Sequence, residues 1–436
     1  MPISKIAAVT GRRIWDSRGR PTVEVDLLLD DGSRGRGMAP AGASTGAGEA
    51  CDLRDGGPRL GGLDVGRAIA NVNGPIRDRL CGWPADQAAI DAALIDADGT
   101  PNRSRLGGNA LIATSLALLA ARAASAKMPL WRFLLGAREG STGEVWIPAP
   151  EIQIFGGGAH ARGSCDIQDF LIVPVAAADF ATGLEWVAEV YHAAGRQLAQ
   201  EGALQGVADE GGFWPNFKRN EDGLVALTRA IEAAGFVPGR DIVIALDAAA
   251  TQWRGADGYR WQLDARTFTV DALLDEYGRW LDRYAIASIE DPVAEDDAAA
   301  MQEFTRRFGH RIQVVGDDYL CTSAPRIAQA AAAKACNTVL IKPNQAGTVT
   351  ETIAAIAAAR AAGYRIIVSA RSGETEDATL AHLAVGWQAD QIKVGSFARS
   401  ERMAKWNEVL RIEESLGGGA RYRGASPFPA RWVEMP

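Results

Sequence analysis

The chain lacks the features that mark nucleic-acid-binding, membrane and secreted proteins. It contains no basic run, and its formal net charge is −8, so nucleic acid is not an expected partner. No stretch reaches about 18 uninterrupted apolar residues, the length that a membrane helix needs. The opening residues, MPISKIAAVTGRRIW, contain no apolar signal-peptide core. These absences predict a cytoplasmic protein that does not bind a membrane.

Cysteine is scarce as well, since the sequence has five and none belongs to a CxxC pair. Paired cysteines are typical of zinc and redox sites, whereas scattered ones favour free thiols in a reducing compartment. The five are Cys51, Cys81, Cys165, Cys321 and Cys336.

The composition that is present is globular, with 47% hydrophobic and 23% charged residues. A chain of 436 residues is too long for one ordinary core, so two domains are expected. Residues 22–37, TVEVDLLLDDGSRGRG, alternate in polarity and then turn at Asp31-Gly32. A Gly/Ser/Thr-rich loop follows at 39–50, and a helical pattern runs from 66 to 126. Strands followed by helices predict a first domain of the α+β class.

The remainder of the chain has a different rhythm, in which short β-rich runs alternate with alanine-rich helical stretches. This alternation predicts a parallel sheet with crossover helices, and the length favours a closed (β/α)8 barrel over an open sheet. The runs lie at residues 170–175, 242–246, 286–289, 312–316, 338–341 and 366–369.

Polar residues follow these runs directly, where barrel enzymes carry their chemistry. Any one strand-end acid could simply cap the next helix or form an ion pair. Acids and lysines that recur at this position around one ring instead favour a site. They are Asp247, Glu290, Asp291, Asp317, Asp318, Lys342 and Lys393, together with Arg371 and Ser372 after the last run.

Converging carboxylates would repel one another unless a cation neutralised them. Oxygen ligands without histidine or cysteine favour a hard cation, which indicates Mg2+. A lysine beside another lysine and a divalent cation loses its proton more easily and could act as a base. Arg371 and Ser372 suit a phosphate or carboxylate. Together these groups predict proton abstraction beside a substrate carboxylate.

The sequence resembles the enolase family over essentially its whole length. The resemblance implies an N-terminal α+β capping domain (1–135) and a C-terminal (β/α)8 TIM barrel (136–436) that starts with a partly antiparallel order. A lysine base acting with Mg2+ is the established pattern of that superfamily. The motifs that carry the resemblance are WDSRGRPTVEV, GASTG, LGGNALIATSLA, GGAHA with DIQDF, DEGGF, ALDAAA, SIEDP, VGDD, IKPNQAGTVTET, RSGETED and QIKVGSFARSERMAKWN.

The resemblance also implies a role for individual residues. Lys342 would abstract the C2 proton of 2-phosphoglycerate, while Lys393 holds the substrate carboxylate. Glu210 would help the C3 hydroxyl leave, with His160, Asp169 and Asp209 nearby. The 39–50 loop would close over the site and exclude water, and a homodimer is expected. The implied Mg2+ ligands are Asp247, Glu290 and Asp317, and the implied phosphate ligands are Arg371 and Ser372.

Five positions depart from the family pattern, and all of them belong to the loop or the pocket. Ala370 replaces a histidine beside the phosphate-binding arginine, and Ala41 replaces the loop serine that binds a second Mg2+. A histidine cannot become alanine without losing a hydrogen-bond donor and leaving space. The other three are Asp169 for glutamate, Gly156 for asparagine and Trp214 for alanine.

These departures leave the lysines and the metal-binding carboxylates intact. This indicates that carboxylate binding and proton abstraction are retained while the rest of the pocket accommodates something larger, rather than decay of the gene. The leading interpretation is a paralogue that resembles carboxyphosphonoenolpyruvate synthase of phosphinate biosynthesis. Such an enzyme joins a phosphoglycerate-derived unit to a nucleotide-activated phosphonoformate, and Trp214 could stack on the base. An ordinary or slow phosphopyruvate hydratase of glycolysis is the first alternative. A non-catalytic metabolite-binding homologue is the second.

Overall fold

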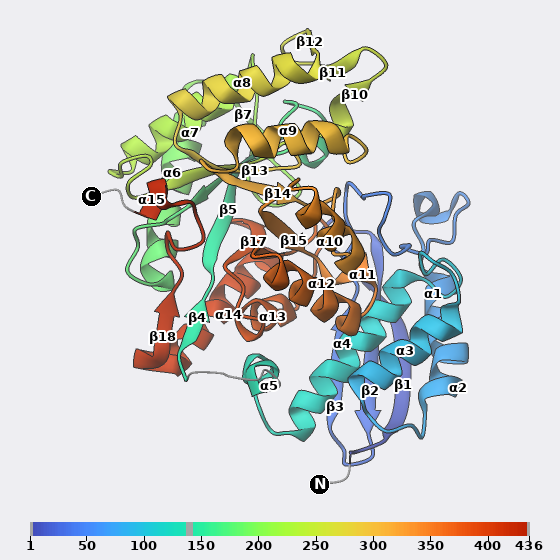
Figure 1. Cartoon of the computed structure of the whole chain (residues 1–436). Helices are drawn as coiled ribbons and strands as arrows, with labels where there is room; N and C mark the ends of the chain where they lie inside the picture. Colours follow the sequence, from blue (N-terminus) through green and yellow to red (C-terminus); the bar gives the residue numbers. More distant parts are fainter. Residues whose placement is uncertain (1–2, 137–142, 434–436) are drawn as a thin grey trace.

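The computed structural model describes residues 3–136 and 143–433. The first part is an antiparallel sheet in the order β1-β2-β3, covered by helices on one side (Figure 1). This arrangement confirms the predicted strands followed by helices. The strands are β1 (Ile6–Trp15), β2 (Pro21–Leu29) and β3 (Arg34–Met38), and the helices are α1 (Gly66–Asn71), α2 (Arg77–Leu80), α3 (Gln87–Asp98), α4 (Gly108–Ser125) and α5 (Leu130–Gly136).

Helix α4 packs tightly against β2 and β3. A Cβ atom on Gly37 would lie 2.2 Å from the carbonyl oxygen of Ala113, so only glycine permits this approach. Among the described residues, α4 alone has the length and mean hydropathy of a membrane-crossing helix. However, 78% of that apolar stretch is buried inside the protein, as expected of a core helix.

The second part is a closed barrel, which confirms the predicted fold class. Its strand order is β5-β6-β9-β13-β14-β15-β16-β17, and β17 pairs with β5 to close the ring. Strand β6 is antiparallel to both of its neighbours, so the start of the barrel has the expected irregular order. The strands are β5 (Ala149–Gly156), β6 (Asp169–Val173), β9 (Val243–Asp247), β13 (Ile286–Glu290), β14 (Gln313–Gly316), β15 (Thr338–Ile341), β16 (Arg365–Ser369) and β17 (Gln391–Ser396).

Helices cover the outside of this ring (Figure 1). A hairpin of β7 (Leu204–Val207) and β8 (Phe213–Pro215) extends the sheet beside β5. The larger outer helices are α6 (Phe180–Gln200), α7 (Glu221–Ala233), α8 (Val270–Arg283), α9 (Ala298–Phe308), α10 (Ala324–Ala332), α12 (Val349–Ala361), α13 (Thr379–Gly386) and α14 (Ser400–Leu416).

Every apolar run predicted from the sequence overlaps a barrel strand, whereas β5 and β17 lie outside those runs. The apolar pattern of β5 is interrupted by Glu151 and Gln153, which are both buried inside the barrel. Glu151 Oε2 accepts a hydrogen bond from Gln391 Nε2 at 2.9 Å, and Gln153 donates to Asp169. The barrel interior satisfies these polar groups, which is why a buried strand can contain them.

The capping domain meets the barrel where the barrel strands end. The backbone N–H of Ser17 donates to the carbonyl of Glu374 (2.7 Å), and that of Ala50 donates to the carbonyl of Gln345 (2.8 Å). Ala41 and Gly373 exchange two backbone hydrogen bonds of 3.1 and 2.9 Å. These contacts hold residues 39–50, the closing loop, over the ends of β15 and β16.

Candidate active site

The three carboxylates predicted as Mg2+ ligands lie at neighbouring strand ends. Asp247 is the last residue of β9 and Glu290 is the last residue of β13, and the two are register partners. Asp317 directly follows β14, the next strand of the ring. All three side chains are buried.

Lys393 extends from β17 into this group of acids. Its Nζ lies 2.8 Å from Glu290 Oε2, 3.3 Å from Asp247 Oδ2 and 3.6 Å from Asp169 Oδ2. Burial alone would lower the pKa of Lys393, but the carboxylates of Glu290 and Asp247 raise it well above its usual value. Lys393 is therefore a buried cation, as a ligand for a substrate carboxylate must be.

Lys342, which follows β15, is paired with Asp317. The other oxygen of Asp317, Oδ1, accepts a hydrogen bond from Gln345 Nε2 at 2.9 Å. Burial opposes the charge on Lys342, yet the Asp317 carboxylate outweighs it and the pKa of Lys342 is raised. A base must be neutral before it accepts a proton. Lys342 can therefore act as a base only if its ion pair with Asp317 is weakened.

A second set of acids at these strand ends has a structural role. Asp291 accepts hydrogen bonds from the backbone N–H groups of Asp317 (3.0 Å) and Asp318 (2.8 Å), so it orders the loop after β14. The oxygens of Asp291, Asp317 and Asp318 lie within 4.8 Å of one another. Burial and the Asp317 charge raise the pKa of Asp318 to about 7. Over the described residues, the carboxylates of Asp247, Glu290 and Asp317 do not form a group with oxygens this close together. The two lysines lie among them instead.

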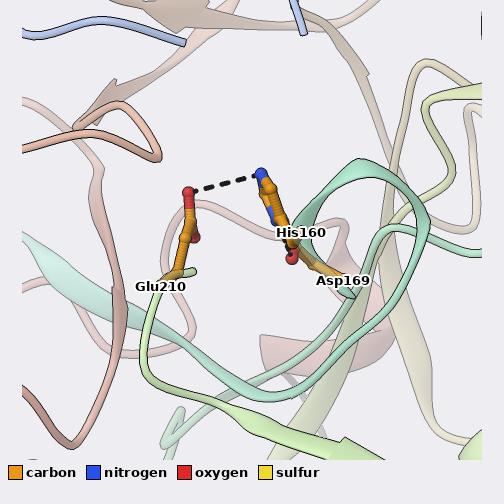
Figure 2. A group of neighbouring side chains, drawn as sticks. All are labelled: His160, Asp169 and Glu210. Carbon is orange, nitrogen blue, oxygen red and sulfur yellow. Dashed lines mark hydrogen bonds and ion pairs between the residues drawn. The ribbon is translucent and has the colours of Figure 1, made fainter. Parts of the chain in front are cut away.

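His160 lies between two carboxylates, one of which, Asp169, also contacts Lys393. Its Nδ1 lies 2.8 Å from Asp169 Oδ1, and its Nε2 lies 3.7 Å from Glu210 Oε1, a contact that is dashed in Figure 2. Burial alone would lower the pKa of His160, but these two acids raise it to about 9. The imidazolium in turn helps to hold the pKa of Asp169 well below its usual range, against the effect of burial.

The charged His160 predicts a pH-dependent stability. Since its folded-state pKa of about 9 exceeds the unfolded value of about 6.5, its stabilisation is fully present below about pH 6.5 and is lost as the pH rises through about 9. The melting temperature of the wild type should therefore exceed that of His160→Gln by several degrees at pH 6.5, at roughly 2–4 °C per kcal/mol. Calorimetry at about pH 9.5 should find a smaller gap, and an equal gap would contradict the assignment.

Arg371, after β16, is fully enclosed by the closing loop and its neighbours. Its Nη1 lies 2.8 Å from Glu49 Oε2, and its Nη2 donates to the carbonyl of Ser44 at 3.0 Å. Ser372 Oγ accepts a hydrogen bond from the backbone N–H of Ala43 at 2.6 Å. The two residues predicted to bind phosphate thus lie together, and the loop itself contacts both.

The predicted groups surround a cavity of about 290 Å3, which we call the catalytic cavity. Ala370 lines it beside Arg371, and the backbone N–H of Ala370 donates to the carbonyl of Lys393 at 2.8 Å. Glu290 and Asp317 contact two lining residues, Lys393 and Lys342. The other predicted residues in the lining are Asp169, His160, Glu210, Asp247 and Ser372.

The remaining altered positions lie outside this lining. Over the described residues, the cavity wall includes neither Trp214 nor Ala41. The Trp214 ring on β8 instead faces the guanidinium of Arg162, 6.0 Å from the ring centroid, and its indole N–H is buried without a partner. At Gly156, a Cβ atom would lie 2.5 Å from the Cβ of Ala208, so Ala208 takes up the space of a side chain there.

Comparison with known families decides the relationship. Residues 6–134 match the model described as the enolase N-terminal domain, and residues 144–430 match the enolase C-terminal TIM barrel domain. The chain belongs to the enolase family. It is 47% identical to Enolase 1 of Desulfitobacterium hafniense (strain Y51) over 437 residues, which cover 99% of this chain and 98% of that protein. It is 48% identical to Enolase of Acidothermus cellulolyticus (strain ATCC 43068 / DSM 8971 / 11B) over 425 residues, or 97% of each.

Mg2+ is the cofactor of the enolase family, and the acidic residues of this chain fit it. Glu290 Oε1 and Asp169 Oδ2 are buried without a hydrogen-bond partner. Buried acceptor oxygens of this kind are costly unless they contact a cation or a donor. Burial, together with the charge of Asp247, raises the pKa of Glu290 well above its usual value. A divalent cation would relieve this crowding, since Mg2+ prefers carboxylate oxygens.

Sequence reasoning missed two residues that connect the parts of this enolase-family site. Glu49 lies within the predicted loop but was not predicted to pair with Arg371. Gln345 contacts Asp317 at 2.9 Å and Glu49 at 3.3 Å. Its place three residues after Lys342, within IKPNQAG, was an available signal because that segment begins at a strand end.

Proposed function

We propose that this enolase-family chain removes the C2 proton of a 2-phosphoglycerate-type substrate. Lys342 is the base, Lys393 holds the substrate carboxylate, and Arg371 with Ser372 holds the phosphate. The observation that carries the proposal is the convergence of these four side chains on one buried cavity. Two lysines and an anion clamp around one cavity suit a small phosphorylated carboxylate.

The two lysines have different roles, which follow from their positions in the site. Lys393 stays charged among its carboxylates and so orients an incoming carboxylate. Lys342 acts as a base only when its ion pair with Asp317 is weakened. Mg2+ held by Asp247, Glu290 and Asp317 would compete for that carboxylate, lower the pKa of Lys342 and stabilise negative charge on the substrate.

Glu210 lines the catalytic cavity beside His160, where it would face the leaving group. Its carboxylate is buried, lies 3.7 Å from the charged ring of His160, and lines the same cavity as Lys342. A carboxyl group there would donate a proton to the departing C3 hydroxyl. Asp169 holds His160 from the other side at 2.8 Å, so it positions the pair.

The direct test of this function is proton exchange. The protein is mixed with 2-phosphoglycerate and Mg2+ in D2O, and the C2 proton signal is followed by 1H NMR. Loss of that signal is expected, because a reversible base returns deuterium to C2. A signal that persists at high enzyme concentration would refute the proposal and would favour a non-catalytic binding protein.

Metal removal should abolish the exchange. Chelation with EDTA is expected to lower the rate by at least about 10²-fold, since a correctly placed charge in such a site contributes this much. Excess Mg2+ should restore it in the wild type. Glu290→Gln should need far more Mg2+ for half-maximal exchange, whereas a variant of the same size far from the site, Glu232→Gln, should behave as the wild type. Exchange that survives EDTA would contradict the requirement for a metal.

We further propose that the chain is a specialised paralogue of the carboxyphosphonoenolpyruvate synthase type, which accepts a nucleotide-activated phosphonoformate as co-substrate. The supporting observation is that Ala370, with its small side chain, lines the catalytic cavity beside Arg371. Trp214 does not support it in the described state, because its ring lies against Arg162. An ordinary or slow phosphopyruvate hydratase is the alternative, favoured by the level of identity to two proteins named enolase.

The homodimer and the cytoplasmic location remain predictions. The first follows from the resemblance to the enolase family, and the second from the composition of the sequence. Light scattering on the purified protein would check the first.

A further inference from the structure

Glu151 of β5 is a buried carboxylate inside the barrel that has no part in the proposed chemistry. It is 2% exposed, and among the described residues it does not belong to the lining of the catalytic cavity. An ionised carboxylate is costly to bury unless a cation and hydrogen-bond donors compensate its charge. The groups around Glu151 therefore indicate what it does.

Glu151 belongs to a layer of polar side chains across the barrel interior. Its Oε2 accepts a hydrogen bond from Gln391 Nε2 at 2.9 Å, and Gln391 Oε1 accepts one from Gln313 Nε2 at 2.6 Å. Gln313 Nε2 also donates to the carbonyl of Pro427 at 3.3 Å, near the C-terminal end of the described chain. The side chains of Glu151, Gln391 and Gln313 are all buried. This network holds the carboxylate of Glu151 in one place.

Lys393 is the cation that compensates Glu151. The two residues are register partners on β17 and β5. Gln391, which binds Glu151, precedes Lys393 by two residues and so lies on the same face of β17. Burial raises the pKa of Glu151 to about 7, and the charge of Lys393 is the main effect that opposes this rise. At pH 8, Glu151 is therefore mostly ionised and attracts the ammonium group of Lys393.

The other carboxylates around Lys393 have further partners. Glu290 and Asp247 lie 2.8 and 3.3 Å from its Nζ, but both are proposed Mg2+ ligands, and a divalent cation on them would repel the ammonium group. Asp169, 3.6 Å from the same Nζ, is shared with the charged histidine ring of the site. Glu151 is not a proposed ligand, so metal binding does not draw it away from Lys393.

We propose that Glu151 is a positioning residue, which holds the ammonium group of Lys393 at the wall of the catalytic cavity when Mg2+ is bound. This inference rests on the proposed function, in which Lys393 binds the substrate carboxylate. Glu151 acts through Lys393 and does not contact the substrate. Its loss should therefore weaken binding of the carboxylate but not of the phosphate, which Arg371 and Ser372 hold.

Isothermal titration calorimetry on the Mg2+-loaded protein at pH 8 tests the inference with two matched probes. Phosphoglycolate carries a phosphate and a carboxylate, whereas ethyl phosphate carries a methyl group in place of the carboxylate. The wild type is expected to bind phosphoglycolate more tightly. Glu151→Gln, which removes the charge and keeps the shape, should weaken phosphoglycolate binding by at least about 10-fold and leave ethyl phosphate binding unchanged. Glu276→Gln, which removes a buried carboxylate from the outer helix α8, is the matched control and should bind both probes as the wild type.

Two results with the variant would overturn the inference. If Glu151→Gln binds phosphoglycolate as tightly as the wild type, the inference is refuted and the proposed function stands. If Glu151→Gln loses affinity for both probes equally, Glu151 only maintains the fold of the barrel. A wild type that does not prefer phosphoglycolate to ethyl phosphate would refute the carboxylate role of Lys393, and with it both the proposed function and this inference.

Discussion

Lys342→Ala is expected to abolish exchange of the C2 proton of 2-phosphoglycerate with solvent. Lys342 lies at the end of β15 and lines the catalytic cavity, where its only ion-pair partner over the described residues is Asp317. Lys393 cannot replace it, because three carboxylates hold that side chain as a cation. Loss of a positioned base typically costs about 10²–10⁴-fold in rate.

The measurement is the decay of the C2 proton signal in D2O at saturating substrate and Mg2+. Lys218→Ala, which removes an exposed lysine far from the barrel strand ends, is the control and should exchange as the wild type. Calorimetric binding of the substrate should be largely retained in Lys342→Ala, since Arg371 and Lys393 remain. Exchange at the wild-type rate would show that another group is the base.

The double change Ala41→Ser with Ala370→His is expected to raise dehydration of 2-phosphoglycerate to phosphoenolpyruvate by about 10²-fold or more. Ala370 lines the catalytic cavity, so a histidine there would fill space and restore a hydrogen-bond donor. The backbone of Ala41 already holds the loop to Gly373, and a serine would leave those hydrogen bonds unchanged. The same change should block use of any nucleotide-activated co-substrate.

Phosphoenolpyruvate formation is followed by its ultraviolet absorbance for the wild type, each single variant and the double variant. Ala43→Ser, in the same loop, is a control for a hydroxyl group at a neighbouring position. If the wild type forms phosphoenolpyruvate at an ordinary rate and the double variant changes this rate little, the interpretation as a specialised paralogue is contradicted. The ordinary phosphopyruvate hydratase would then become the better description of the chain.

Strand ends could be predicted from the sequence because their signal is local. A short apolar run followed by an acid or a lysine requires only that the run form a parallel strand, since the ends of such strands then meet. Asp247, Glu290 and Lys342 all follow this rule, and the structure places them together. The first barrel strand was missed because Glu151 and Gln153 break its pattern, and the partner of Glu151 on β17 is distant in sequence.

The pairing of charges across the site could not be predicted in the same way. The ion pair between Glu49 and Arg371 could not be predicted from the sequence, because it depends on the loop lying over the barrel. Likewise, acids and lysines were expected together on one ring, but the sequence did not indicate that Lys393 pairs with Glu290 and Lys342 with Asp317. The contact between Trp214 and Arg162 could not be predicted either, since Arg162 belongs to a different segment of the chain.

The tight contact of β3 with α4 has a mechanical consequence for turnover. The closing loop begins directly after β3. Gly37 of β3 packs closely against the backbone of Ala113, so this end of the loop is fixed in place. The other end is tied by the hydrogen bond from Ala50 to Gln345. Because both ends of this short loop are fixed, the loop has already lost much of its conformational entropy. The free energy of opening it is therefore mainly that of the contacts that break. We therefore expect the loop to open and close without unfolding of the capping domain.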